Sequence, residues 1–166
     1  MLKALSLFFT LAFVFLQGCS SNGLDHSPPR ITRISESDIR AFDRSMDLTL
    51  ISRDLELYAM HLSEGFFFSE GELAETQIRM GRQEYLEKVK GLFLEATSIA
   101  TDSKIIKAEI DEGGKVARVR VMQTNKITLQ GRTQLSVSIF EIDLVVENGY
   151  LVADKFHVTN SFFGYL

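Results

Sequence analysis

The chain has 166 residues, of which 45% are hydrophobic and 13 are phenylalanine, enough apolar material for one packed domain. Its formal net charge of −4 at pH 7 disfavours nucleic acid as a partner and provides no electrostatic attraction to anionic lipid. The single cysteine excludes a disulfide within the chain, since a disulfide needs two thiols.

The first 18 residues are predicted to be a signal peptide. Lys3 supplies a positive charge, and residues 4–16 are apolar apart from Ser6 and Thr10. This apolar run is shorter than the roughly 20 residues that a membrane-spanning helix needs. We therefore expect the segment to be removed and not to remain as a membrane anchor.

A short motif ends this segment: Leu16, Gln17 and the small residue Gly18 precede Cys19. The motif resembles the lipobox of bacterial lipoproteins. The resemblance implies that the chain is cut before Cys19 and that acyl chains are attached to its sulfur and to the new amino group. Two acyl chains hold a protein stably on a membrane. In a Gram-negative cell, Ser20 at the next position implies the outer membrane, facing the periplasm. The alternative is an ordinary cleaved signal with a cysteine nearby by chance.

With Cys19 acylated, no thiol remains for a metal site or a nucleophile. The segment 20–34 contains Gly23, Pro28 and Pro29 and is predicted to be a flexible linker. A single domain is expected over 35–166.

Helices are predicted in the first half of that domain. Ser35 and Asp38 have the spacing of a helix cap and predict a short helix over 36–44. Apolar residues at spacings of three and four predict a second helix over 46–63 whose core face is formed by Leu48, Ile51, Leu55, Tyr58 and Leu62. The opposite side of that helix is apolar too, so it is expected to be covered either by the preceding helix or by a second subunit; it carries Met46, Leu50, Leu57 and Met60.

Between the helices, Phe66, Phe67 and Phe68 predict a short buried strand, followed by a loop over 69–81. A third helix is predicted over 82–96, with one apolar stripe formed by Tyr85, Leu86, Val89, Leu92, Phe93 and Ala96.

From residue 98 onward the apolar period changes to two, which predicts strands. Ile106, Ala108 and Ile110 alternate with charged residues before a turn at Gly113 and Gly114. The next strand places Ala117, Val119 and Val121 inward. A long strand over 133–146 has apolar residues first on one parity and then on the other, which predicts a β-bulge. A turn at Asn148 and Gly149 leads to a last strand over 150–158.

Helices followed by a bent antiparallel sheet define an α+β class in which N-terminal helices pack on the sheet. This order resembles the cone-shaped nuclear transport factor 2-like superfamily, also called SnoaL-like, over about residues 36–163. The residues that carry the likeness are 81–84, which open the middle helix, and 149–152, which open the last strand. The resemblance implies a pocket at the open end of the cone. It does not imply one activity, because the superfamily includes dehydratases, isomerases, ligand binders and assembly modules.

Asp154 is the first candidate for a catalytic residue. It lies within a set of alternating residues on the last strand that are expected to face the core, namely Tyr150, Val152, Phe156 and Val158. A carboxylate on an apolar face is a candidate general base, and Tyr58 or His61 would orient a substrate oxygen. The alternatives are that Asp154 lies near a frayed strand end or pairs with an arginine, and that Tyr58 is an ordinary core tyrosine.

No metal or other cofactor is predicted. His26 lies in the linker, His157 has the outward parity, and His61 has no second histidine at ligand spacing. Glu141 and Asp143 are expected on the outer face, opposite the arginines at positions 118 and 120.

The C-terminal aromatic tail has two interpretations: a plug over the edge of the cone, or an exposed patch for a partner or a homodimer. It comprises Phe162, Phe163, Tyr165 and Leu166. The favoured function is that of an envelope lipoprotein that binds a small apolar ligand or a protein partner without catalysis. The alternatives are a small-molecule isomerase or dehydratase with Asp154 as its base, and a structural subunit of an envelope complex.

Overall fold

The computed structural model describes residues 30–71 and 78–165. The predicted signal peptide, Cys19, His26 and most of the predicted linker lie outside these residues, as does Leu166. No helix in the described part of the chain is long and apolar enough to cross a membrane.

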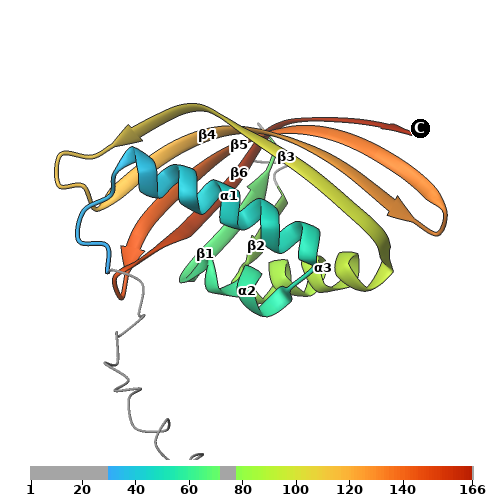
Figure 1. Ribbon diagram of the computed structural model, residues 1–166, viewed down its shortest axis with the longest axis horizontal. Coiled ribbons are helices and arrows are strands. Elements are labelled where there is room, and N and C mark those ends of the chain that lie inside the picture. Colours follow the sequence, from blue (N-terminus) through green and yellow to red (C-terminus); the bar gives the residue numbers. More distant parts are fainter. Residues whose placement is uncertain (1–29, 72–77, 166) are drawn as a thin grey trace, which may run out of the picture.

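Six strands form one bent sheet, and three helices lie on its concave side (Figure 1). The helices are α1 (Glu36–Ser52), α2 (Leu55–Met60) and α3 (Arg82–Glu95), and the strands are β1 (Leu62–Glu70), β2 (Ile78–Gly81), β3 (Ala96–Ile110), β4 (Val116–Leu129), β5 (Arg132–Glu147) and β6 (Tyr150–Tyr165). Their order across the sheet is β2-β1-β6-β5-β4-β3. All neighbouring strands are antiparallel except β1 and β6, which are parallel. The predicted α+β class is confirmed.

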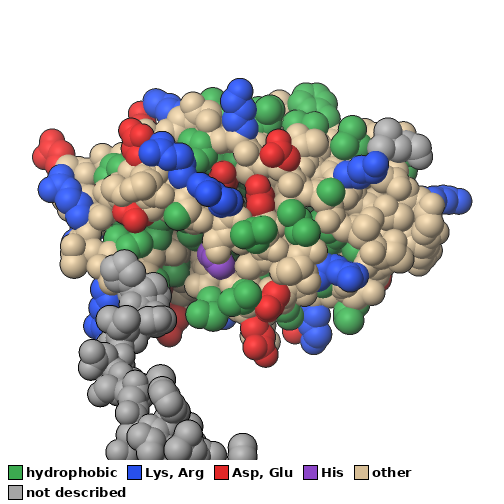
Figure 2. Space-filling view, in the orientation of Figure 1, with side chains coloured by type: hydrophobic (Ala, Val, Ile, Leu, Met, Phe, Trp, Pro, Cys, Tyr) green, Lys and Arg blue, Asp and Glu red, His purple; other side chains and the backbone are tan. Residues whose placement is uncertain are grey.

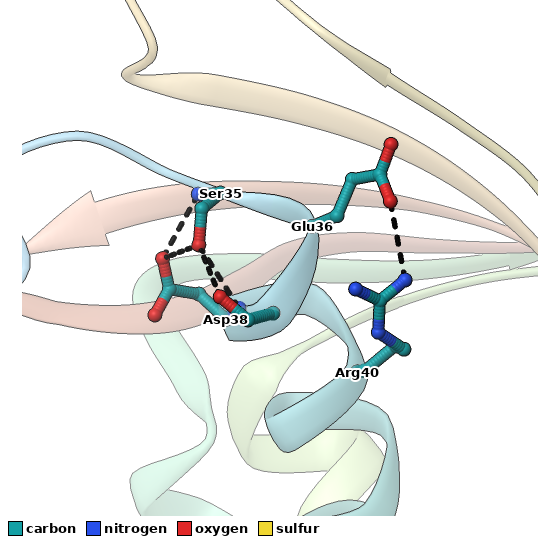
Figure 3. Close-up of polar contacts among 5 residues, drawn as sticks. Ser35, Glu36, Asp38 and Arg40 are labelled. Atoms are coloured by element: carbon teal, nitrogen blue, oxygen red, sulfur yellow. Dashed lines mark hydrogen bonds and ion pairs between the residues drawn. The ribbon is translucent and has the colours of Figure 1, made fainter.

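The predicted cap at the start of α1 is confirmed. The Ser35 hydroxyl accepts from the Asp38 backbone N–H, and the Asp38 carboxylate accepts from the Ser35 backbone N–H at 2.9 Å (Figure 3). One turn further, Arg40 pairs with Glu36 at 3.1 Å on the solvent side. This reciprocal pair satisfies backbone donors that a helix start otherwise leaves without a partner.

The predicted division into helices over 36–44 and 46–63 is wrong. One helix, α1, continues through residue 45, because no glycine, proline or other breaker interrupts it, and ends where Arg53 adopts a left-handed conformation (φ 57°). Asp54 then caps the short α2 by accepting from the Leu57 N–H at 3.0 Å. Leu62, placed in the predicted helix, begins β1.

The face of α1 that packs inward is also different from the predicted one. Its buried side chains are Ile39, Phe42, Met46 and Thr49, whereas Leu48 is 60% exposed and Ile51 is exposed as well. These residues recur at spacings of three and four, and they are the ones that α1 turns toward the sheet. Of the predicted second stripe, Met46 is buried, but Leu57 and Met60 are exposed on α2.

Elsewhere in the helical half, the predicted aromatic strand and third helix are present, and the predicted loop over 69–81 is wrong in part. The aromatic run lies on β1, where Phe66 and Phe68 are buried and Phe67 points out. Helix α3 follows the predicted range to within one residue and buries Val89 and Phe93. The predicted loop over 69–81 contains the strand β2, and its residues 72–77 lie outside the description.

The predicted bulge within the strand over 133–146 is wrong. Strands β4 and β5 pair in unbroken register, and the shifts occur between β5 and β6, where Asp154 and Thr159 are the extra residues on β6. Consequently β5 keeps one parity throughout. Ser136 and Ser138 face inward in line with Leu144, while the alternating apolar residues of this part of β5 lie on the outer face: Leu135, Val137 and Ile139.

A register shift also makes the predicted inward face of β3 wrong at Ile106. It occurs between Ile105 and Lys107 in the pairing with β4, so Ile105 packs against the core and Ile106 is exposed. The predicted inward parity of β4 is confirmed, since Ala117, Val119 and Val121 are buried.

The end of the predicted linker is packed against the domain. The Ile31 N–H donates to the Gly149 carbonyl and the Ile34 N–H to the Gly114 carbonyl, each at 2.7 Å, and Ile34 is buried in the core. Both glycines have positive φ, which fits the two hairpin turns predicted there. The folded domain therefore begins several residues before position 35.

Candidate functional site

A cavity of about 180 Å³ lies between the three helices and the concave face of the sheet. Its wall combines a larger apolar part, with both aliphatic and aromatic side chains, and a smaller polar part. Helices supply Phe42, Asp43, Met46, Leu50, Tyr58, Tyr85, Val89 and Leu92, and strands supply Ile99, Ser103, Val121, Gln123, Asn125, Ile127, Phe140, Ile142 and Phe156.

The apolar part contains a pair of buried tyrosines. The hydroxyl oxygens of Tyr58 and Tyr85 are 2.7 Å apart. Burial raises the pKa of Tyr85 to about 12 and the pKa of Tyr58 well above its ordinary value, so both hydroxyls stay protonated at neutral pH. One hydroxyl proton lies between the two oxygens, and the second remains available to donate to a ligand.

Asp43 is the carboxyl group of the cavity. It lies on α1 directly after buried Phe42 and is half-buried. Burial, followed by the charges of Asp47 and Asp102, raises the pKa of Asp43 from its ordinary value of 3.8 to about 6. Among the residues that the structure describes, no hydrogen bond or ion pair occupies this carboxyl. Asp43 is thus free to exchange a proton with a molecule in the cavity.

Asp47, one turn further along α1, is held in place instead. Its carboxylate accepts from the Ser103 backbone N–H at 3.1 Å and from the Ser103 hydroxyl at 2.7 Å, with longer contacts of 3.4 Å from Thr101 and from Gln123. These contacts join α1 to β3 and β4 at the polar end of the cavity. Asp47 therefore acts as a fixed negative charge behind two of the residues that line the cavity, Ser103 and Gln123.

The structure places Asp154 away from this cavity. Asp154 is the extra residue at a register shift of β6, so the neighbouring Ala153, which is 0% exposed, is the residue that faces inward. The Asp154 carboxylate accepts a hydrogen bond from the Ser63 hydroxyl at 2.7 Å. Tyr150, expected to face inward with it, is exposed. The prediction that Asp154 shares the core-facing set is wrong, because a bulge changes which side chains point inward.

His61 lies at a second hollow, of about 600 Å³, between α1, α2 and the β5–β6 turn. Its Nδ1 is 2.7 Å from the Leu57 carbonyl, so Nδ1 carries a proton and donates it. Its Nε2 lies 2.8 Å from the Ser45 hydroxyl. Of the three predicted candidates, only Tyr58 lines the main cavity.

The outer-face predictions are confirmed. His157 has the outward parity and lies 2.9 Å from the Ser69 hydroxyl, and Arg118 pairs with Asp143 at 2.9 Å across the outer face. Of the two interpretations of the tail, the plug is wrong, since Phe162 and Phe163 are exposed and Tyr165 is 81% exposed.

On the face shown in Figure 2, basic, acidic and hydrophobic side chains are interleaved, without a block of one charge. Within the described ranges, no group of three or more His, Cys, Asp and Glu side chains is arranged to hold a metal ion.

No protein-family model matches the sequence, and no curated protein is significantly similar to it. Solved structures are similar in fold. A putative scytalone dehydratase from Novosphingobium aromaticivorans is 12% identical, with a TM-score of 0.64 over 76% of this chain and 85% of that one. A hexachlorocyclohexane dehydrochlorinase, LinA-type3 from Novosphingobium barchaimii, is 9% identical, with a TM-score of 0.60 over 78% and 88%. A conserved protein from Planctomyces limnophilus is 15% identical, with a TM-score of 0.59 over 79% and 97%.

These neighbours have the helices-on-bent-sheet architecture described above. The chain has the nuclear transport factor 2-like cone fold. The predicted fold resemblance is confirmed, and the cavity of this chain lies inside the cone. Identities this low support the fold alone, so function has to be argued from the side chains of the cavity.

Proposed function

We propose that the cavity binds a small, mainly apolar molecule and that Asp43 acts there as a general base, in a proton-transfer reaction of the isomerase or dehydratase type. The observation that carries this proposal is a carboxyl group that has no partner among the described residues, half-buried in the wall of an apolar cavity, with a pKa raised to about 6. A base whose pKa lies near the working pH is ionised at neutral pH and still has a strong tendency to take a proton.

The tyrosine pair supplies the second chemical group. Abstraction of a proton from carbon leaves negative charge on an adjacent carbonyl or on a departing oxygen. The free hydroxyl proton of the Tyr58–Tyr85 pair can donate to that oxygen, and because both rings are fixed by packing, the donor needs little reorganisation. The names of two fold neighbours, a dehydratase and a dehydrochlorinase, agree with elimination chemistry in a cavity of this kind.

Binding without catalysis is the competing function, and elimination of an activated probe separates the two. We choose 5-nitrobenzisoxazole, a neutral molecule in which loss of one ring proton to a base breaks the N–O bond and forms a cyanophenol. The full-length protein is expected to accelerate this elimination over buffer. The rate should rise as the pH increases through about 6 and then level, because only the ionised Asp43 accepts a proton. A rate equal to that of buffer at every pH would refute the general-base role.

We also propose that the domain is attached to the cell envelope through lipid on Cys19, at the outer membrane facing the periplasm if the source is Gram-negative. The support is the predicted signal peptide and the lipobox-like motif before the single cysteine. Replacing Cys19 with serine in the full-length chain is expected to release the protein from the membrane fraction, since no acyl chain can then be attached. Fractionation and radiolabelled palmitate incorporation measure this, and equal labelling of both forms would exclude the anchor.

A further inference from the structure

The polar end of the cavity is negatively charged. Asp43 lines it, Asp47 lies behind Ser103 and Gln123, and Asp102 is close enough to affect the charge state of Asp43. In the described part of the chain, none of these three carboxylates forms an ion pair with a basic side chain. Their field therefore acts on whatever occupies the cavity.

Basic side chains are missing from the cavity wall as described. The lining contains no lysine, arginine or histidine. Lys104 and Lys126 are the lysines nearest in sequence to the polar lining residues of β3 and β4. Each alternates with lining residues along its strand, so each points to the opposite face of the sheet. An anion in the cavity would be repelled with nothing to pair with it, whereas a cation would be attracted.

The remaining wall is suited to the same kind of ligand. Tyr85 packs edge-on against Phe156 with ring centroids 6.1 Å apart, and Phe156 against Phe140 at 6.3 Å. Aromatic rings at these separations pack well against a further ring, so this part of the wall suits the ring of a ligand and leaves its charged group to the polar end. The buried tyrosine pair adds a hydroxyl oxygen lone pair and one unpaired hydroxyl proton.

The size of the cavity limits the ligand further. An enclosed apolar cavity of about 150 Å³ holds one benzene molecule. At about 180 Å³, this cavity surrounds one six-membered ring with a short substituent, and because it is partly open, the remainder of a larger molecule would extend to solvent.

We propose that the cavity selects a single-ring organic cation, with its ring among Tyr58, Tyr85 and Phe156 and its ammonium group directed at the end that contains Asp43 and Asp47. This inference rests on the proposed function only in placing the ligand in that cavity. It names a substrate class for the same site, an amine-bearing ring compound. The carbon next to the ammonium group then lies beside the Asp43 carboxylate.

Three probes of similar size and different charge test the selectivity: benzylammonium, benzyl alcohol and benzoate. Calorimetric titration of the full-length protein near neutral pH is expected to give benzylammonium a dissociation constant at least about tenfold lower than that of benzyl alcohol, which corresponds to about 1.4 kcal/mol. Benzoate is expected to bind more weakly than either.

Asp47→Asn keeps an oxygen that accepts from Ser103 but removes the negative charge. This variant should reduce the preference for benzylammonium over benzyl alcohol at least about threefold, while its affinity for benzyl alcohol stays the same. Asp154→Asn removes a carboxylate outside the cavity and should change none of the three affinities. Equal binding of the probes, a preference for benzoate, no binding of any probe, or a preference that Asp47→Asn leaves intact would each refute charge selection. Acceleration of the neutral benzisoxazole elimination would then still support the general base, so the two proposals fail separately.

Discussion

Asp43→Asn is expected to slow the elimination of 5-nitrobenzisoxazole by at least about 100-fold, which is the lower end of what a positioned general base contributes. An asparagine amide has nearly the shape of the carboxyl group but does not accept a proton, so the cavity keeps its volume and loses its base. Because Asp43 is without a protein partner in the described structure, the substitution breaks no existing hydrogen bond or ion pair. The measurement is the rate of product formation by both forms across the pH range.

The free energy of unfolding of Asp43→Asn provides a control, because the variant is expected to be more stable than the wild type at high pH and not at low pH. The folded-state pKa of Asp43, about 6, lies above the ordinary value of 3.8, so folding favours its neutral form. That contribution to stability is fully present below pH 3.8 and is lost as the pH rises through 6. The asparagine side chain of the variant stays neutral at every pH, so the variant should be more stable than the wild type by about 1 kcal/mol at slightly alkaline pH, allowing for the partial exposure of the group. Below about pH 4 the difference should vanish.

Asp154→Asn is the matched comparison. Its carboxylate accepts from Ser63 outside the cavity, so this variant should retain the wild-type rate. Activity lost in Asp154→Asn and kept in Asp43→Asn would reverse the assignment and return the base to the residue that sequence reasoning chose.

Phe66→Ala is expected to lower the free energy of unfolding by about 3 to 5 kcal/mol, the cost of removing a fully buried phenylalanine and leaving a cavity. Phe66 is 2% exposed and its ring packs against Tyr85 and Phe156, both with centroids 5.1 Å away. The same two rings form the cavity wall, so the variant should also lose affinity for single-ring probes. Urea denaturation measures the stability change.

Phe67→Ala is the matched control, because it makes the same substitution one residue further along β1. Phe67 points out of the sheet and is 40% exposed, with the Lys155 ammonium 5.5 Å from its ring centroid. Its loss should cost about 1 kcal/mol or less. Equal costs for the two variants would contradict the inward assignment of Phe66.

The candidate site shows where prediction from sequence ends. Tyr58 was expected on a core face and is buried, but it lies on the short α2, and two residues of the same predicted face, Leu48 and Ile51, are exposed. Its partner Tyr85 is 27 residues away, and no periodicity relates the two hydroxyls. Asp43 is not among the candidates named from the sequence, and an acidic residue on an amphipathic helix usually faces water. Its position directly after Phe42 becomes a signal only once the inward face of α1 is known.

Local chemistry in the sequence determined the cap at Ser35, the turns at Gly114 and Gly149, the third helix and the inward parity of β4. These features depend on contacts within a few residues or on an uninterrupted period, so the sequence alone contains them. The tertiary structure decided the inward stripe of α1, the face of β5 that holds Ser136 and Ser138, and the outward turn of Asp154. Each of these depends on which element covers which face of a helix or strand, and on where the register between β5 and β6 shifts by one residue. Such choices minimise the free energy of the whole packed domain, and one segment read by itself does not encode them.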